Sequence, residues 1–349
     1  MTENPEMEKE CFMPVKESHL PSHQTPMVSV AMITYNHEPF IREAIEGVLM
    51  QQTTFPYELV IGEDCSTDRT REICIEYRQK HPDKIRLLLN DKNLGMMPNF
   101  IQTLNACSGK YIALCEGDDY WIDTMKLQKQ VDILEYDPQI GICYTDVDMY
   151  LQETGIFHRS VFENGIIKRH TDFYEFLANM GYLAPLTWVF RRATYDTLDI
   201  GNPTDGSFVV MLEFMRNSRV YYLNEVTGIY RKHKNGISSR KNGCKSYKQW
   251  KGVFETQKKY VNTKEIDEKL RLKILSQGYN MLLYEALKYD DREFINEAEA
   301  FFNDISVSFS EMYSYCQRIL NLERSASFRL GQMILYPFHY LKNLVGKKR

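Results

Sequence analysis

The sequence lacks three features, each of which is typical of a different class of proteins. No apolar stretch reaches the roughly 20 residues that a membrane-spanning helix needs. The formal net charge is -4, whereas proteins that bind nucleic acid normally carry a basic excess. The 8 cysteines are scattered and include no C-x-x-C pair, which argues against a zinc site and favours free thiols in a reducing cytoplasm.

The first residues also lack the pattern of a signal peptide, because acidic residues and prolines stand where an apolar core would be needed. We expect residues 1–26 to form a disordered tail. The rest of the chain has enough apolar residues, 43% overall, to bury a full core. From about residue 245 onward, helical patterns dominate. We therefore predict an α/β domain over residues 27–244 and a helical region over residues 245–349.

Strand and helix signals alternate through the first half of the chain. Short apolar runs are separated by amphipathic segments of helical length, a pattern that indicates parallel βαβ units. In such sheets the ligand lies beyond the carboxyl ends of the strands. The expected strands cover residues 28–33, 57–61, 85–89, 110–115 and 140–144.

Three of these strands end in polar or acidic residues, at 34–36, 63–64 and 116–119. One such end alone would be interpreted as a helix cap. The third is different, because Glu116, Asp118 and Asp119 follow a strongly apolar strand. Three acids in four residues repel one another unless a cation is present. The cluster therefore favours a metal site.

The sequence resembles the family 2 glycosyltransferases over residues 27–240, and is most similar to a bacterial branch that makes cell-surface polysaccharides. In that branch the segments C-E-G-D-D-Y-W and K-L-Q-K-Q-V are typical, and both occur here. Further motifs that resemble the family are the opening strand with its T-Y-N end (28–36), the D-D-G-S-T-D segment (63–68), the N-x-G turn (93–95) and the D-x-D-D-x-W segment (116–121).

The chain departs from the family pattern at four positions. One is Thr124, which stands where proline is common at a helix start, and either residue suits that position. Glu63 and Glu116 stand where aspartate is usual, which keeps the charge and lengthens the side chain. Cys65 stands where glycine is usual. The turn at Cys65 must therefore be one that a side chain can tolerate.

The resemblance implies a GT-A fold, a Rossmann-like three-layer sandwich with a mixed, mostly parallel sheet, followed here by a helical C-terminal appendage. It also implies a metal-dependent glycosyltransferase of the hexosyltransferase class. The enzyme would move a sugar from a nucleoside-diphosphate sugar to a saccharide or lipid-linked acceptor, with inversion, in cell-surface polysaccharide synthesis. The expected cofactor is Mg²⁺ or Mn²⁺, because these hard cations favour carboxylate and phosphate oxygens.

The resemblance also assigns site residues. Asp118 is the expected metal ligand, with His233 as a further ligand or a diphosphate contact. Asp119 either contacts the sugar hydroxyls or caps the next helix. Arg231 would hold the diphosphate, after a strand at 220–223 and a turn at 225–228. The residues expected to bind the nucleotide sugar are Thr34, Tyr35, Asn36, Glu38, Glu63, Asp64, Asn93, Glu116, Gly117, Asp119 and Arg231.

The acceptor hydroxyl needs a general base. Asp205, just before an apolar helical run, resembles the acid that serves as the base in related sequences, although its position also suits a helix N-cap. Glu213 is the reserve candidate, two helical turns further along.

The C-terminal end is apolar, aromatic and basic over residues 328–349. It would either lie on the inner leaflet near a lipid-linked acceptor or pack on the protein as a helix broken at Pro337. We expect a cytoplasmic protein, or one peripheral to the inner face of the plasma membrane.

Two rival functions remain open. A nucleotidyltransferase would use a similar sheet, but it usually has a glycine-rich basic loop where residues 34–38 stand here. A catalytically inactive sugar-nucleotide-binding module is the other alternative, which the retained acidic cluster argues against.

Overall fold

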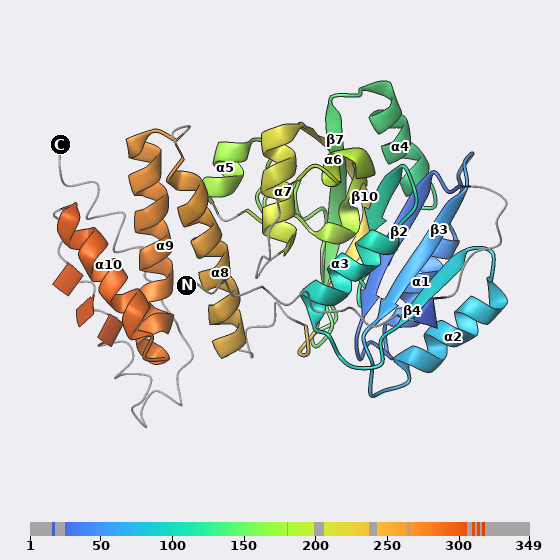
Figure 1. The fold of residues 1–349 in the computed structure, drawn as a ribbon, viewed down its shortest axis with the longest axis horizontal. Helices are drawn as coiled ribbons and strands as arrows, with labels where there is room; N and C mark the ends of the chain where they lie inside the picture. The colour runs from blue at the N-terminus through green and yellow to red at the C-terminus, as the bar shows by residue number, and fades with distance from the viewer. Residues whose placement is uncertain are drawn as a thin grey trace, which may run out of the picture. The chain divides into compact units, whose positions relative to one another are not determined.

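The computed structural model describes residues 16–17, 25–179, 181–198, 206–236, 243–263 and 266–305, with three short pieces between 309 and 317. The chain divides into two compact units, residues 1–270 and 271–349 (Figure 1). Nearly all of the expected N-terminal tail and the C-terminal end from residue 318 lie outside the described residues. The expected boundary near residue 244 stays a prediction, and α8 (Gly243–Val261), which follows it, belongs to the first unit.

The first unit is built around one mixed sheet. The strands are β1 (Lys16–Glu17), β2 (Val28–Thr34), β3 (Tyr57–Glu63), β4 (Ile85–Leu89), β5 (Tyr111–Leu114), β6 (Tyr120–Trp121), β7 (Ile140–Leu151), β8 (Ile156–His158), β9 (Val189–Arg191) and β10 (Arg219–Lys232). The other helices of this unit are α1 (Ile41–Leu49), α2 (Thr70–Lys80), α3 (Met96–Ala106), α4 (Lys126–Tyr136), α5 (Phe173–Ala178), the 3₁₀ helix η1 (Pro185–Thr187), α6 (Arg192–Tyr195) and α7 (Gly206–Asn217).

The strand order is β1-β4-β3-β2-β5-β9-β7-β10-β6, with β8 paired to β7. Neighbours β4, β3, β2 and β5 are parallel, and so are β7 and β10, whereas β9 runs antiparallel between β5 and β7. This order confirms the predicted mixed, mostly parallel sheet. Strands β2 and β3 are buried along almost their whole length, as expected for strands with helices on both faces.

The carboxyl ends of the parallel strands meet at one edge of the sheet. Backbone hydrogen bonds join the residues that follow them: Asp64 N donates to Thr34 O at 3.0 Å, and Gly117 N donates to Ile33 O at 3.0 Å. Asn90 N, after β4, donates to Glu63 O at 3.1 Å. The polar strand ends found in the sequence therefore lie side by side.

Strand β10 differs from the expectation. The turn expected at residues 225–228 is absent, and the strand continues to Lys232 through two register shifts against β7, one between Leu223 and Val226 and one between Val226 and Ile229. The polar residues Asn224 and Glu225 and the small Gly228 are typical of turns, but here they lie at bulges, which such residues also favour.

The segment after the acidic cluster anchors η1 and the start of β9. Trp121 Nε1 donates to Leu186 O at 2.8 Å, and Gln130 Nε2 donates to Thr187 O at 2.9 Å. The fully buried Lys126 also donates to Thr187 O, at 3.2 Å, and its Nζ lies 4.9 Å from the centre of the Trp121 ring. The K-L-Q-K-Q-V motif thus has a structural role beneath the site.

The second unit contains most of α9 (Glu268–Lys288) and α10 (Arg292–Asp304). The Tyr279 ring of α9 lies 5.5 Å from the Phe294 ring and 5.0 Å from the Phe301 ring of α10. These helices confirm the helical C-terminal appendage. Within the described part of the chain, every helix is too short or too polar to cross a bilayer.

Burial lowers the pKa of the Lys126 ammonium group to about 7. The unfolded chain holds this proton up to about pH 10 and the folded chain only to about pH 7, so the contribution of Lys126 to the free energy of unfolding rises with pH across that window. We predict that Lys126→Met removes this rise, measured as the difference from wild type in urea unfolding at pH 7, 8 and 9. Lys129→Met on the same helix is the matched control, because ion pairs with Asp123 and Glu225 raise the pKa of Lys129. An identical pH dependence in Lys126→Met and wild type would contradict the prediction.

Candidate active site

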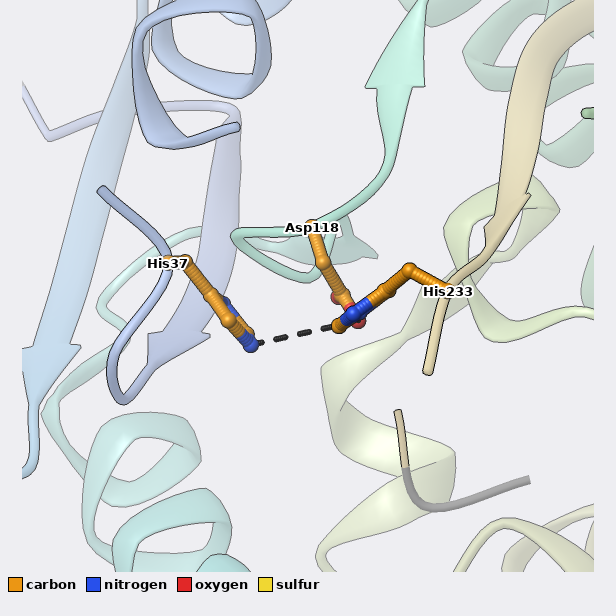
Figure 2. Close-up of side chains that lie close together, drawn as sticks. All are labelled: His37, Asp118 and His233. Carbon is orange, nitrogen blue, oxygen red and sulfur yellow. Dashed lines mark hydrogen bonds and ion pairs between the residues drawn. The ribbon is translucent and has the colours of Figure 1, made fainter. Parts of the chain in front are cut away.

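Asp118 lies between two histidines at the carboxyl edge of the sheet. Its Oδ2 is 3.0 Å from His233 Nε2 and 3.9 Å from His37 Nε2. One ligand atom from each of the three residues lies within 4.8 Å of the others. Figure 2 shows the three side chains converging on one point from separate parts of the chain. This is the arrangement of a candidate metal site.

Each of the three residues follows a strand that ends at this edge. His37 follows β2, Asp118 follows β5 and His233 follows β10. The loop that carries Asp118 approaches β2 closely at Gly117, where an added Cβ would lie 2.6 Å from Thr34 Oγ1 and 3.0 Å from His37 Nδ1. Only glycine fits between the acidic loop and the first strand, which explains its place in the motif.

The acids of the loop differ in their electrostatic environment. Burial alone would raise the pKa of Asp118, but the nearby His37 and the hydrogen bond with His233 outweigh it and lower that pKa. Burial and the charge of Asp118 raise the pKa of Glu116 to about 7. Burial and the neighbouring acids also raise the pKa of Asp119 well above its ordinary value. Crowded carboxyl groups of this kind are relieved by a cation.

Two further observations indicate that the acidic loop and its surroundings could bind a cation and a polar ligand. Glu116 Oε2 is buried and has no hydrogen-bond partner among the described residues. Burial lowers the pKa of His37, against the opposing effect of Asp118, so its imidazole is neutral at pH 7 and available as a ligand. The donor set therefore suits a divalent metal ion.

Arg231 ties β10 to the acidic loop. Its backbone N donates to Asp119 Oδ1 at 2.8 Å and its Nε to Asp118 O at 2.9 Å. The guanidinium group also donates to Glu43 and Gln152, and its Cζ lies 4.8 Å from the Phe40 ring centre. With 7% of its surface exposed, Arg231 holds the loop in place, and its expected contact with a diphosphate stays a prediction.

The carboxylate of Asp119 accepts this hydrogen bond from the β10 backbone. The sequence left two roles open for Asp119, a sugar contact or a cap of the next helix. The hydrogen bond from Arg231 N is a third role, which the sequence did not predict. Asp119 is 3% exposed and holds β10 against the acidic loop, and its expected contact with the sugar stays a prediction.

A cleft of about 340 Å³ opens beside His233. The expected nucleotide-binding residues Asn36 and Glu38 line it. Other lining residues are Pro39, Phe40, Thr67, Asp68, Gln152, Glu153, Lys234 and Asn235. A second cavity of about 460 Å³ lies at the opposite edge of the sheet, where β7 and β10 begin, and it is lined by no carboxylate or histidine among the described residues.

Several of the other expected nucleotide contacts are not among the residues that line this cleft, and they make local hydrogen bonds. Glu63 accepts hydrogen bonds from Ser66 N and Arg71 Nε. Asp64 accepts from Leu94 N, Gly95 N and Asn90 Nδ2, and Asn93 Nδ2 donates to Asp64 O. Thr34 is buried below His37, whereas Tyr35 is 40% exposed. Their contacts with a nucleotide stay predictions.

The turn after β3 has the backbone conformation that glycine favours. Cys65 has φ 59°, in the left-handed region, where a side chain costs roughly 1 kcal/mol or more. Its thiol lies 3.6 Å from Asp91 O.

The expected base, Asp205, lies outside the described residues. The reserve candidate Glu213 accepts hydrogen bonds from Tyr260 of α8 and from Asn217. Glu213 therefore links α7 to α8.

The sequence interpretation missed His37 as a site residue. The signal was present, because His37 follows the first strand at the same edge as the acidic cluster. A single histidine in a polar loop gave no reason to connect it with Asp118 before the strand order was known.

The strand order and the acidic loop after β5 define the GT-A class of folds. Residues 29–198 match the family described as glycosyl transferase family 2. Residues 29–198 therefore belong to that family, as their motifs indicated.

Some known proteins have a similar sequence, and others have a similar fold. An uncharacterized protein of Mycobacterium tuberculosis is 32% identical over 238 residues, which cover 68% of this chain and 64% of that protein. S. aureus TarS in complex with UDP-GlcNAc has a similar fold, with a TM-score of 0.53 over 83% of this chain and 79% of that chain, at 18% identity. The mannosyltransferase PcManGT of Pyrobaculum calidifontis, in complex with GDP-Man and Mn²⁺, has a TM-score of 0.50 over 91% of this chain and 86% of that chain, also at 18% identity.

The close approach at Gly117 predicts a specific energetic coupling. Gly117→Ala places a methyl group against Thr34 Oγ1 and Cβ, so we expect it to lower the free energy of unfolding by about 1–3 kcal/mol. Thr34→Ala removes the nearest contact atom, so the double variant should lose less than the sum of the two single changes. Urea unfolding of all four proteins measures the coupling. Strict additivity would show that the two residues do not press on each other.

Proposed function

We propose that this protein transfers a sugar from a nucleoside-diphosphate sugar to a hydroxyl group of a saccharide or lipid-linked acceptor. The observation that carries the proposal is the position of Asp118 between His37 and His233, beside the cleft at the carboxyl edge of the sheet. Ligands of open α/β sheets bind at this edge. The similar structures in complex with UDP-GlcNAc and with GDP-Man and Mn²⁺ support a nucleotide-sugar donor.

Sugar transfer breaks the bond between the anomeric carbon and the diphosphate, which leaves with added negative charge. A divalent cation such as Mg²⁺ or Mn²⁺, when bound, would stabilise that charge as a Lewis acid. Asp118 and His233 would hold the cation. Glu116 Oε2, which is buried and has no partner among the described residues, would accept a hydrogen bond from a donor hydroxyl, because an unsatisfied buried acceptor is costly.

The nucleotide would occupy the cleft, where Asn36 and Glu38 line one wall. Both residues are fixed by the α2 loop: Thr67 N donates to Asn36 Oδ1 at 2.8 Å, and Arg69 N donates to Glu38 Oε2 at 3.2 Å. Such fixed polar groups orient a ligand without being reorganised when it binds. Arg231 keeps the metal-binding loop in position.

Asp205 is the proposed general base, which would take the proton of the acceptor hydroxyl as the anomeric carbon is attacked. If the base acts from the face opposite to the leaving diphosphate, the anomeric configuration inverts. The polysaccharide role, the acceptor and a location at the inner face of the plasma membrane are expectations from the resemblance and from residues 328–349, which lie outside the described part of the chain.

The first test is Asp118→Asn. We expect it to reduce metal-dependent hydrolysis of UDP- or GDP-sugars at least about 100-fold, because the cation contributes several kcal/mol. The assay measures release of nucleoside diphosphate with Mn²⁺ or Mg²⁺ across a panel of donors. Asp132→Asn, an exposed aspartate on α4, is the matched control and should retain activity.

The rival functions give different results in the same assay. A nucleotidyltransferase would release pyrophosphate from a nucleoside triphosphate. An inactive module would bind a donor without releasing the diphosphate. If no donor is consumed and Asp118→Asn changes nothing, the enzyme proposal is wrong.

The second test concerns the base. Asp205→Asn should lower transfer to an acceptor by about 10²- to 10⁴-fold, the range for loss of a general base. The thermal stabilisation by the donor should persist, because a ligand of the folded state raises its melting temperature whether or not it reacts. Asp196→Asn, an exposed residue near Arg192, is the control. Equal transfer rates in Asp205→Asn and wild type would exclude Asp205 as the base.

A further inference from the structure

His37 is held on the side of its ring that faces away from Asp118. Thr34 Oγ1 lies 3.3 Å from Nδ1, and the backbone N of His37 donates to Thr70 Oγ1 at 2.8 Å. Gly117 lies against the same side, since an added Cβ there would be 3.0 Å from Nδ1. With Nδ1 facing Thr34, the other nitrogen, Nε2, points toward Asp118 (Figure 2).

The two histidines contact Asp118 differently. His233 Nε2, at 3.0 Å from Asp118 Oδ2, is within hydrogen-bond distance, whereas His37 Nε2, at 3.9 Å, is too far for a hydrogen bond. Asp118 therefore does not fix the direction of the His37 ring. Contacts at Nδ1 orient the ring, so that Nε2 faces Asp118 Oδ2 across a gap. Two ligands of one metal ion, each bonded at about 2.1 Å, are separated by gaps of this size.

His233 is also supported from behind. Its ring packs 4.7 Å from the Phe40 ring, and Phe40 is itself covered by the Arg231 guanidinium group. The His37 and His233 rings stand nearly perpendicular, at 88°, with their centres 6.2 Å apart. A polar partner on the far ring nitrogen, such as Thr34 Oγ1 at His37, is typical of metal-binding histidines. The contact with Phe40 restricts the His233 ring by packing.

We propose that His37, Asp118 and His233 together form a two-histidine, one-carboxylate metal site, with His37 as the third protein ligand. Two imidazoles and one carboxylate suit first-row transition metals such as Mn²⁺, whereas Mg²⁺ favours oxygen ligands only. The site therefore selects Mn²⁺ over Mg²⁺ and binds it before any nucleotide is present. A metal ion held by three protein ligands would have further coordination positions, which diphosphate oxygens would take. Its use in catalysis rests on the proposed function, but the binding of the metal ion does not.

The experiment measures Mn²⁺ binding to the full chain without nucleotide, by electron paramagnetic resonance of the free ion. We expect one bound Mn²⁺, displaced by Mg²⁺ only at about 100-fold excess or more, as the preference of imidazole ligands implies. His37→Gln should weaken Mn²⁺ binding at least about tenfold. His81→Gln is the matched control, because His81 lies at the C-cap of α2, next to the opposite edge of the sheet.

Electron spin-echo envelope modulation identifies the ligands directly. Wild type should show coupling of Mn²⁺ to histidine nitrogens, and His37→Gln and His233→Gln should each remove part of it. Thermal unfolding of the metal-free variants, within a few degrees of wild type, shows that each is folded. Unchanged nitrogen coupling and unchanged affinity in folded His37→Gln would overturn the proposal, as would displacement of Mn²⁺ by equimolar Mg²⁺.

These outcomes are separable from those of the glycosyltransferase proposal. If Mn²⁺ binds through His37 but no donor is consumed, the metal site stands and the proposed function fails. If donors are consumed with Mg²⁺ as readily as with Mn²⁺, and His37→Gln leaves metal binding intact, the proposed function stands and the third ligand is wrong.

Discussion

The hydrogen bonds between Arg231 and the acidic loop hold the two halves of the site together. The loop follows β5, near the middle of the sheet, whereas Arg231 lies at the end of β10, three strands away in the sheet order. Arg231 N to Asp119 and Arg231 Nε to the Asp118 carbonyl join these two places. Since His233 follows Arg231 by two residues, the same bonds bring its ring to Asp118.

These hydrogen bonds bring charged groups together in a buried part of the protein. A buried guanidinium group and buried carboxyl groups are stable only when nearly all their hydrogen bonds are made. Arg231 meets that condition through Glu43, Gln152, Asp118 and three aromatic rings. The carboxyl side does not, because Glu116 Oε2 has no hydrogen-bond partner among the described residues. Burial and the neighbouring acids raise the pKa values of Glu116 and Asp119, so negative charge is disfavoured there until a cation and a polar ligand complete the site.

The parallel strands β2 to β5 could be predicted from the sequence because each has a local signal. Apolar runs predicted β2, β3, β4 and β5, and the parallel arrangement placed Thr34, Glu63 and Glu116 at one edge. The continuity of β10 could not be predicted, because Asn224, Glu225 and Gly228 are as common in turns as in bulges. The buried role of Lys126 was also hidden, because nothing local shows that a lysine will lie under Trp121. His37 was missed because its significance depends on residues 81 and 196 positions further along the chain, which only the folded sheet brings together.

The register of β10 against β7 sets the direction of its last side chains. From the pair Leu223–Thr145 to the pair Lys232–Leu151, β10 advances nine residues while β7 advances six. β10 therefore has three more residues than β7 in this stretch. Because side chains alternate between the two faces of a strand, an odd number of extra residues places the side chains beyond the bulges on the opposite face. A single-residue insertion or deletion between 224 and 228 would therefore turn Arg231 and His233 to the other face of the sheet. The length of this stretch is therefore fixed by the site at the end of the strand.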